Sequence, residues 1–215
     1  MKKIITILTL TLISLIIVST ETFAGENIIK KEMFTISDEK DSQIITISGE
    51  ENIRRFQQSL GEEYDPNLVT VIRTIKKSDY NTSPEISTLF IFREYYIKNK
   101  KTSSYTDFRN VLKTYKRPAG KVSISEGVEI ATTFTADAGI SKNLLEAKLG
   151  FSVSSKKTFK ISWSGNYSYP VTIKVYPIYQ RITGEVWDKD VKYDDYIGKF
   201  SVKRPLGDDV RVYKR

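Results

Sequence analysis

The 215-residue sequence contains no cysteine and no histidine. Without cysteine the chain can form no disulfide, thiolate metal site or thiol nucleophile. Without histidine it lacks the commonest general base and the commonest metal ligand. Its 11 glycines are scattered, so there is no Gly-rich loop to cradle a phosphate. A carboxylate pair could still hydrolyse glycosidic bonds, but no spacing singles one out. We therefore expect no enzyme, no cofactor and no metal site.

Long apolar runs are scarce too, and the one at the N-terminus is short. Lys2 and Lys3 precede a run of apolar, Thr and Ser residues from Ile4 to Val18. Its 15 residues fall below the ~20 that span a bilayer. Thr22-Phe23-Ala24 places small residues at the two cleavage positions, which favours a signal peptide over residues 1–24 rather than an anchor. We predict an extracellular, secreted protein. Export without disulfides is typical of a Gram-positive bacterium.

The pattern of the remaining chain predicts a mainly β fold. Helical spacing over 53–60, after a capping box at Ser48 and Glu51, and again over 104–115, predicts two short helices. These belong to a small α+β N-terminal part, residues 25–118, followed by an all-β part, residues 119–215, or by a continuation of the same domain. Strands are expected over residues 33–36, 43–47, 67–76, 87–99, 171–179, 181–187, 197–202 and 210–213. Frequent strands with turn residues between them, including a turn at 205–209, favour a β-sandwich or an extended twisted sheet.

The most informative segment runs from Val122 to Trp163. Even positions are apolar before residue 141, and odd positions are apolar after 144. Such alternation predicts a long antiparallel hairpin with a turn at Lys142-Asn143, which pairs Ile140 with Leu145 and Val122 with Trp163. Between Glu126 and Lys157 the apolar face is long enough for the ~9–11 residues with which a tilted strand crosses a bilayer. The residues of that face are Val128, Ile130, Phe134, Ile140, Leu145, Leu149, Phe151 and Val153.

The net charge of +8 is concentrated in one segment. Residues 93–121 hold nine basic and two acidic side chains. A concentrated basic segment attracts anionic polymers or lipid headgroups, although it can also be an ordinary solvated surface. Nucleic acid is the less favoured partner, because the chain is exported and has no recognition motif. The candidate contact residues are Lys98, Lys100, Lys101, Arg109, Lys113, Lys116 and Arg117.

Aromatic residues gather in the C-terminal half, between Tyr167 and Tyr196. Such rings can be stacking platforms for sugars, but they also fit the pleated surface of a sheet, which is the preferred interpretation. The acidic residues of 188–195 are better explained as a solvated turn than as a Ca²⁺ loop, because lysines interrupt them and no glycine permits the turn.

The alternating hairpin, followed by the segments 150–154, 171–175 and 184–186, resembles the aerolysin-like pore-forming toxins. The resemblance is to the epsilon-toxin and mosquitocidal-toxin branch, covers about residues 119–190 and lies in residue class. In that family secreted monomers oligomerise on a membrane, and one hairpin per subunit joins a transmembrane β-barrel. The resemblance implies a homo-oligomer on membrane lipid, with 128–153 inserting and 93–121 contacting the anionic surface. The alternative is a secreted or wall-associated β-sandwich module that binds an anionic polymer or a host surface through the same basic segment.

Overall fold

The computed structural model describes residues 35–39, 42–76, 94–190 and 192–215. The predicted signal peptide over 1–24 therefore lies outside the described residues, as does the first half of the predicted strand 87–99.

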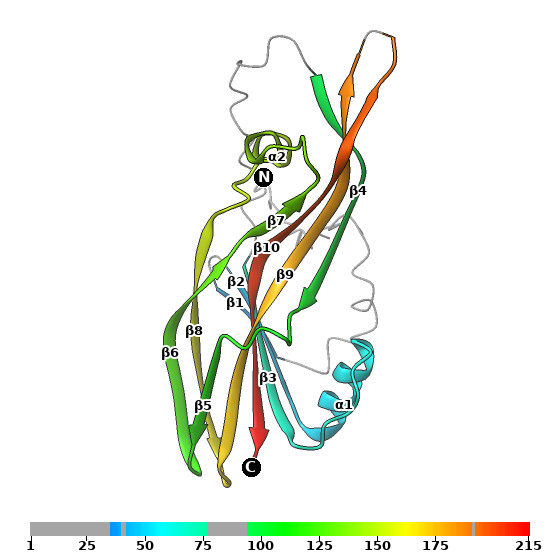
Figure 1. Cartoon of the computed structure of the whole chain (residues 1–215). Helices are drawn as coiled ribbons and strands as arrows, with labels where there is room; N and C mark the ends of the chain where they lie inside the picture. Colours follow the sequence, from blue (N-terminus) through cyan, green and yellow to red (C-terminus); the bar gives the residue numbers. More distant parts are fainter. Residues whose placement is uncertain (1–34, 40–41, 77–93, 191) are drawn as a thin grey trace, which may run out of the picture.

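The fold is mainly β, as predicted, and is built around two long strands (Figure 1). An antiparallel sheet has the order β1-β2-β3-β10-β9-β4, with β5 also paired to β9 and β7 to β10. Its strands are β1 Thr35–Glu39, β2 Ser42–Ser48, β3 Leu68–Lys76, β4 Glu94–Thr106, β5 Lys113–Arg117, β7 Thr133–Ala136, β9 Val171–Lys189 and β10 Asp195–Lys214. A separate two-stranded sheet consists of β6 Gly120–Ala131 and β8 Lys156–Tyr167. The helices are α1 Glu50–Ser59 and α2 Lys142–Leu149.

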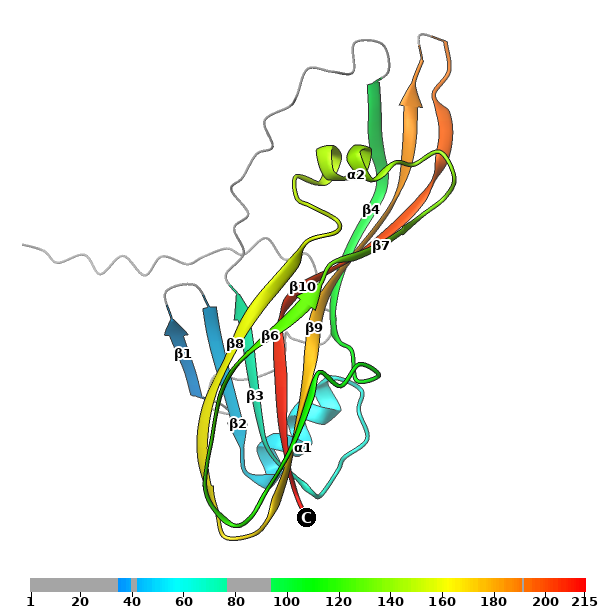
Figure 2. The same ribbon diagram turned by 60° about the vertical axis from the view of Figure 1, so that its left-hand side comes forward.

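Different elements pack on the two faces of the central strands. The part of the molecule that holds α1 therefore has three layers: β6–β8, the large sheet and α1 (Figure 2). On one face, Ile72 of β3 and Val210 of β10 pack against the apolar side of β6–β8. On the other, Val71 and Tyr213 pack against α1. Because successive strand residues point to opposite faces, both cores follow from the alternation. The predicted N- and C-terminal parts share this sheet, since β10 lies between β3 and β9.

Helix α1 confirms the first predicted helix, but its cap differs from the prediction. The N-cap is Gly49, at φ 87°, and no side chain caps the helix. Glu51 instead pairs with Arg55 one turn later, so the predicted capping box is wrong. Glu50 and Glu51 still lie in the first turn, where the helix dipole favours negative charge.

The second predicted helix, over 104–115, is wrong. These residues finish β4, make a turn and enter β5, and both strands pair with β9. The apolar residues that suggested a helical face are divided between two faces of the sheet. Tyr105 and Leu112 pack toward β6–β8, whereas Phe108 lies against Tyr176, 5.1 Å between ring centroids, on the α1 side. Pairing with a long strand overrides a short helical pattern.

The predicted turn at 205–209 is also wrong, because β10 continues through it as one strand. The register against β9 shifts between Pro205 and Gly207, as in a β-bulge. A β-carbon at Gly207 would lie only 1.8 Å from the backbone oxygen of Thr74, so glycine lets β3 and β10 approach here. Likewise, the two strands expected over 171–187 are one strand, β9.

Candidate functional site

The segment 120–167, comprising β6, β7, α2 and β8, forms a strap across the sheet (Figure 1). Strands β6 and β8 confirm the outer half of the predicted hairpin. Ile124 lies opposite Trp163, and Val122 opposite Gly165, so the predicted pairing of Val122 with Trp163 is wrong by two residues. A two-residue shift leaves every side chain on its predicted face.

The inner half of the predicted hairpin is wrong. Lys142-Asn143 is not a turn but the first turn of α2, whose Ser141 side chain accepts a hydrogen bond of 3.2 Å from the Leu144 amide. Gly150 ends the helix in the left-handed conformation, at φ 77°. Leu144 and Leu145 are both buried, which a strand with only one covered face does not allow for neighbours. A local cap, a glycine stop and adjacent leucines thus outweigh the alternation.

All eight candidate insertion residues point inward, but onto different parts of the sheet. Val128 packs in the cluster with Ile72 and Val210, and Ile130 lies with Phe159 and Tyr179. The remaining six pack in a cluster around α2, together with Phe200 and Val202 of β10. Of these six, Ile140, Leu145 and Val153 are buried, whereas Phe134, Leu149 and Phe151 are half-buried.

The outer face of the strap is small and polar. Its exposed residues include Ser123, Ser125, Glu129, Ser162 and Ser164. With valine, isoleucine and phenylalanine beneath and serine above, β6–β8 is a ribbon whose two faces prefer different surroundings.

The strap is attached to the sheet mainly by side chains. Within the described residues, β6 and β8 pair only with each other, and the backbone ladder to the large sheet is the short pairing of β7 with Phe200–Lys203. Side-chain hydrogen bonds supplement it. Lys76 Nζ donates to the Thr158 backbone oxygen, 3.3 Å, the Tyr167 hydroxyl donates to Thr70 Oγ1, 3.1 Å, and the Tyr115 hydroxyl donates to Glu126, 2.9 Å. Next to β7, the Lys199 amide donates to the Asp137 carboxylate, 2.8 Å. The strap could therefore leave with few backbone hydrogen bonds broken.

The candidate basic residues do not form one patch. They follow the edge formed by β4 and β5, with Lys101 opposite Thr183 and Lys116 opposite Thr172. Eleven residues of β9, at ~3.3 Å each, separate these positions by about 36 Å. Lysines on an edge strand also oppose pairing with a second sheet.

Two of these basic residues have acidic partners, and the other five are exposed. Lys98 Nζ is 3.5 Å from Asp194, and Lys113 Nζ is 3.8 Å from Glu126. The pKa of Lys98 is raised by the hydrogen bond with Tyr96 and by Asp194. The remaining candidates, Lys100, Lys101, Arg109, Lys116 and Arg117, are exposed.

An exposed aromatic group, absent from the candidate residues, lies at the end of the β9–β10 hairpin. Tyr193 is 74 % exposed and Tyr196 48 %. The Tyr196 ring meets Trp187 edge-on at 5.3 Å, and the Lys98 ammonium lies 4.3 Å from the Trp187 ring. We call Trp187, Tyr193 and Tyr196 the aromatic tip. Its signal in the sequence is the aromatic spacing within 187–196, which the preferred interpretation assigned to the sheet.

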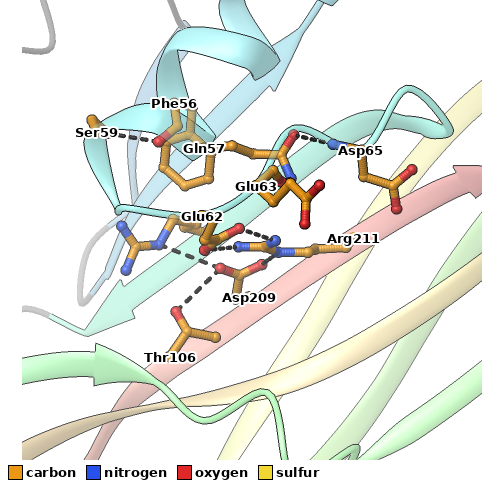
Figure 3. Close-up of polar contacts among 10 residues, drawn as sticks. Phe56, Gln57, Ser59, Glu62, Glu63, Asp65, Thr106, Asp209 and Arg211 are labelled. Atoms are coloured by element: carbon orange, nitrogen blue, oxygen red, sulfur yellow. Dashed lines mark hydrogen bonds and ion pairs between the residues drawn. The ribbon is translucent and has the colours of Figure 1, made fainter.

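Charged groups are also buried within the sheet (Figure 3). On the α1 side, the Arg211 guanidinium donates to both Glu62 oxygens, at 2.6 and 2.8 Å, and to Asp209 at 3.2 Å. Thr106 donates to Asp209 as well, 3.2 Å. The neighbouring Asp208 is fully buried, and neither of its carboxylate oxygens has a hydrogen-bond partner among the described residues. Burial, and next the charge of Asp209, raise the pKa of Asp208 to about 7.

The described residues include no group of three acidic side chains arranged to hold a metal ion. Of the two helices in the described part of the chain, neither is long and apolar enough to cross a membrane.

No family model matches this sequence, and no curated protein does. Among solved structures, the chain aligns with a protein from Bacteroides vulgatus that carries the provisional name pore-forming toxin. The alignment covers 85 % of this chain and 81 % of the other, with a TM-score of 0.27 and 8 % identity. A likeness at this level carries no argument about mechanism. The resemblance to the epsilon-toxin and mosquitocidal-toxin branch therefore stays a prediction.

Proposed function

We propose that this chain is a secreted, non-enzymatic protein that permeabilises target membranes, and that the strap is its membrane-inserting segment. One observation carries the proposal: β6–β8 is a two-faced ribbon packed on the sheet by side chains, and within the described part of the chain the strap's one backbone ladder to the large sheet is that of β7. Its apolar face is covered in the soluble form and would be covered by lipid after insertion.

The register of β6–β8 supports extension into a longer hairpin. Ala131 lies opposite Lys156, and the Thr132 amide donates to the Ser155 oxygen, 2.7 Å, which continues the same pairing. Extended further, this register would place Phe134 opposite Val153. The even positions from 128 to 140 would then lie opposite the odd positions from 159 to 147, and the side chains of each pair would lie on the same face of the hairpin. Each strand would exceed the ~9–11 residues needed to cross a bilayer.

This rearrangement requires α2 to unfold and β7 to leave β10. Helix α2 has 8 residues, fewer than the ~12–15 below which an isolated helix is marginal in water. Its stability therefore depends on packing against β9 and β10, which is lost when the strap departs. The aromatic tip and the exposed lysines of the β4–β5 edge are the groups we assign to first contact with lipid, because tyrosine and tryptophan suit the interface and lysine suits anionic headgroups.

A reversible crosslink tests the proposal, because the natural chain has no cysteine to interfere. Thr135 of β7 lies opposite Ser201 of β10, and facing residues in an antiparallel pair are within disulfide reach. The double variant T135C/S201C should release no dye from liposomes of mixed anionic and zwitterionic lipid when oxidised. Reduction should restore release, because the strap is then untied.

The matched control ties the strap to itself. Ser125 and Ser162 face each other on the exposed side of β6–β8, so S125C/S162C joins the two strands without joining them to the sheet. This variant should release dye whether oxidised or reduced. If the natural chain releases no dye and forms no oligomer on any lipid mixture, the proposed function is wrong. Equal release by oxidised and reduced T135C/S201C would remove the strap from the mechanism.

The exposed lysines and arginines of the β4–β5 edge favour a second candidate function, binding of an anionic polymer on a cell wall or host surface. Salt-sensitive binding of a soluble polyanion, without dye release, would favour this candidate. The double variant K100A/K101A should then weaken binding and reduce its dependence on salt.

A further inference from the structure

Asp208 lies on the strap side of the sheet. It alternates with Val210 and Val212, which pack against β6–β8, and its neighbours across the sheet are Thr74 and Pro177. On the side of Asp208 toward Val210, Ile72 and Val175 pack against β6–β8. On its other side, Tyr179 contacts Ile130 and Phe159 of the strap. The Asp208 carboxyl thus lies beneath the strap, between two apolar clusters that the strap itself completes.

The surroundings of this carboxyl compensate only weakly for its burial. It is 0 % exposed, and neither oxygen has a hydrogen-bond partner among the described residues. The nearby Thr74 hydroxyl favours the ionised form, but less than burial opposes it. Asp209 is next along the chain but faces Arg211 on the α1 side. Several titratable or charged groups occupy strap-side positions around it: Lys76, Tyr105, Lys113, Tyr115, Glu126, Lys157, Tyr179 and Arg204.

We propose that Asp208 is a protonation-dependent latch: the strap is firmly closed while the carboxyl is neutral and is loosened when the carboxyl ionises. An ionised carboxylate needs water or donors. The strap is its cover, and β6–β8 has no backbone ladder to the sheet among the described residues, so lifting the strap is the least disruptive way to hydrate Asp208. Regulation of membrane action by this latch rests on the proposed function, whereas the opening of the strap can be measured without a membrane.

The direction in which strap opening changes with pH follows from the pKa of Asp208 in the closed and open states of the strap. Burial holds the pKa of Asp208 at about 7 when the strap is closed, against an ordinary value of 3.8 when the carboxyl is in water. The closed strap therefore binds the proton more tightly than the open one, so closure is strongest in acid. Between pH 4 and pH 7 the opening equilibrium rises about tenfold per pH unit, and above pH 7 it levels off.

Amide hydrogen exchange of the strap, compared between the natural chain and D208N, tests the latch. The amide of asparagine is close in shape to the neutral acid and does not ionise, so the chemical rate of exchange cancels in the comparison at each pH. In 156–167, exchange of the natural chain relative to D208N should rise about 50-fold from pH 5 to pH 7 and level off near 100-fold above pH 8. Amides that form the ladder between β9 and β10, such as those at the facing pair Ile173 and Val212, serve as the internal reference.

A second variant covers the case in which D208N does not fold. T74V removes the hydroxyl that favours ionisation, so the pH at which strap opening levels off should move upward. A strap whose exchange has the same pH dependence in D208N, or whose opening falls as pH rises, overturns the latch. If opening follows the expected curve but no vesicle releases dye, the latch stands and the proposed function falls. If dye is released equally at pH 5 and pH 8, the latch does not regulate it.

Discussion

Phe159 of β8 offers a direct test of whether the strap opens separately from the rest of the fold. Its side chain is 1 % exposed, packs with Ile130 and Tyr179, and has the Lys76 ammonium 5.0 Å from its ring. Replacing a buried phenylalanine by alanine costs about 3–5 kcal/mol. The backbone ladder of β6–β8 is internal to the strap, so this loss should fall on strap docking. At about 1.4 kcal/mol per tenfold, strap opening in F159A should increase by roughly 100- to 3,000-fold.

The measurement is residue-resolved hydrogen exchange, because partial opening is invisible to a single melting curve. In F159A, amides of β6 and β8 should lose protection by that factor, while amides shared by β9 and β10 keep most of theirs. Phe56 of α1 provides a matched control, since it is also 1 % exposed but packs on the opposite face. F56A should release α1 and leave the strap protected. Equal loss of protection in the strap and in β9–β10 upon F159A would show that the strap is no separate unit, and the reasoning would be refuted.

Two further predictions concern the stability of the central sheet. G207A should destabilise the protein by at least the ~1–3 kcal/mol of an overpacked core, because its new methyl group would lie 1.8 Å from the Thr74 backbone oxygen. Chemical denaturation measures this loss, and unchanged stability would contradict the close approach of β3 and β10. Glu62 accepts two hydrogen bonds from the buried guanidinium of Arg211, and E62Q removes the negative charge of that pair. This variant should lose about 1.5–3 kcal/mol of unfolding free energy in the same denaturation assay; unchanged stability would argue against the ion pair.

Local patterns were sufficient for much of the fold. The alternation of 122–131 and 156–163 predicted two paired strands and the correct inward faces, because side-chain direction in a strand depends only on backbone geometry. The spacing of Ile53 and Phe56 predicted α1 for the same kind of reason. The inward direction of all eight candidate residues followed as well, since an apolar residue facing away from water is favoured in any arrangement that covers it.

Long-range packing decided the rest. Alternation continues through 132–155, but the sequence alone does not say that β10 and a hydrophobic cluster compete for these residues, so it could not predict that β7 and α2 replace the hairpin end. The 36 Å spread of the basic residues depends on both β4 and β5 pairing with β9. The burial of Asp208 depends on the strap, which is distant in sequence. Composition and periodicity thus determined a cysteine-free, mainly β chain with a two-faced ribbon, because these are local properties. The tertiary structure decided where that ribbon lies, what holds it and which acid lies beneath it, because these depend on contacts between segments far apart in the chain.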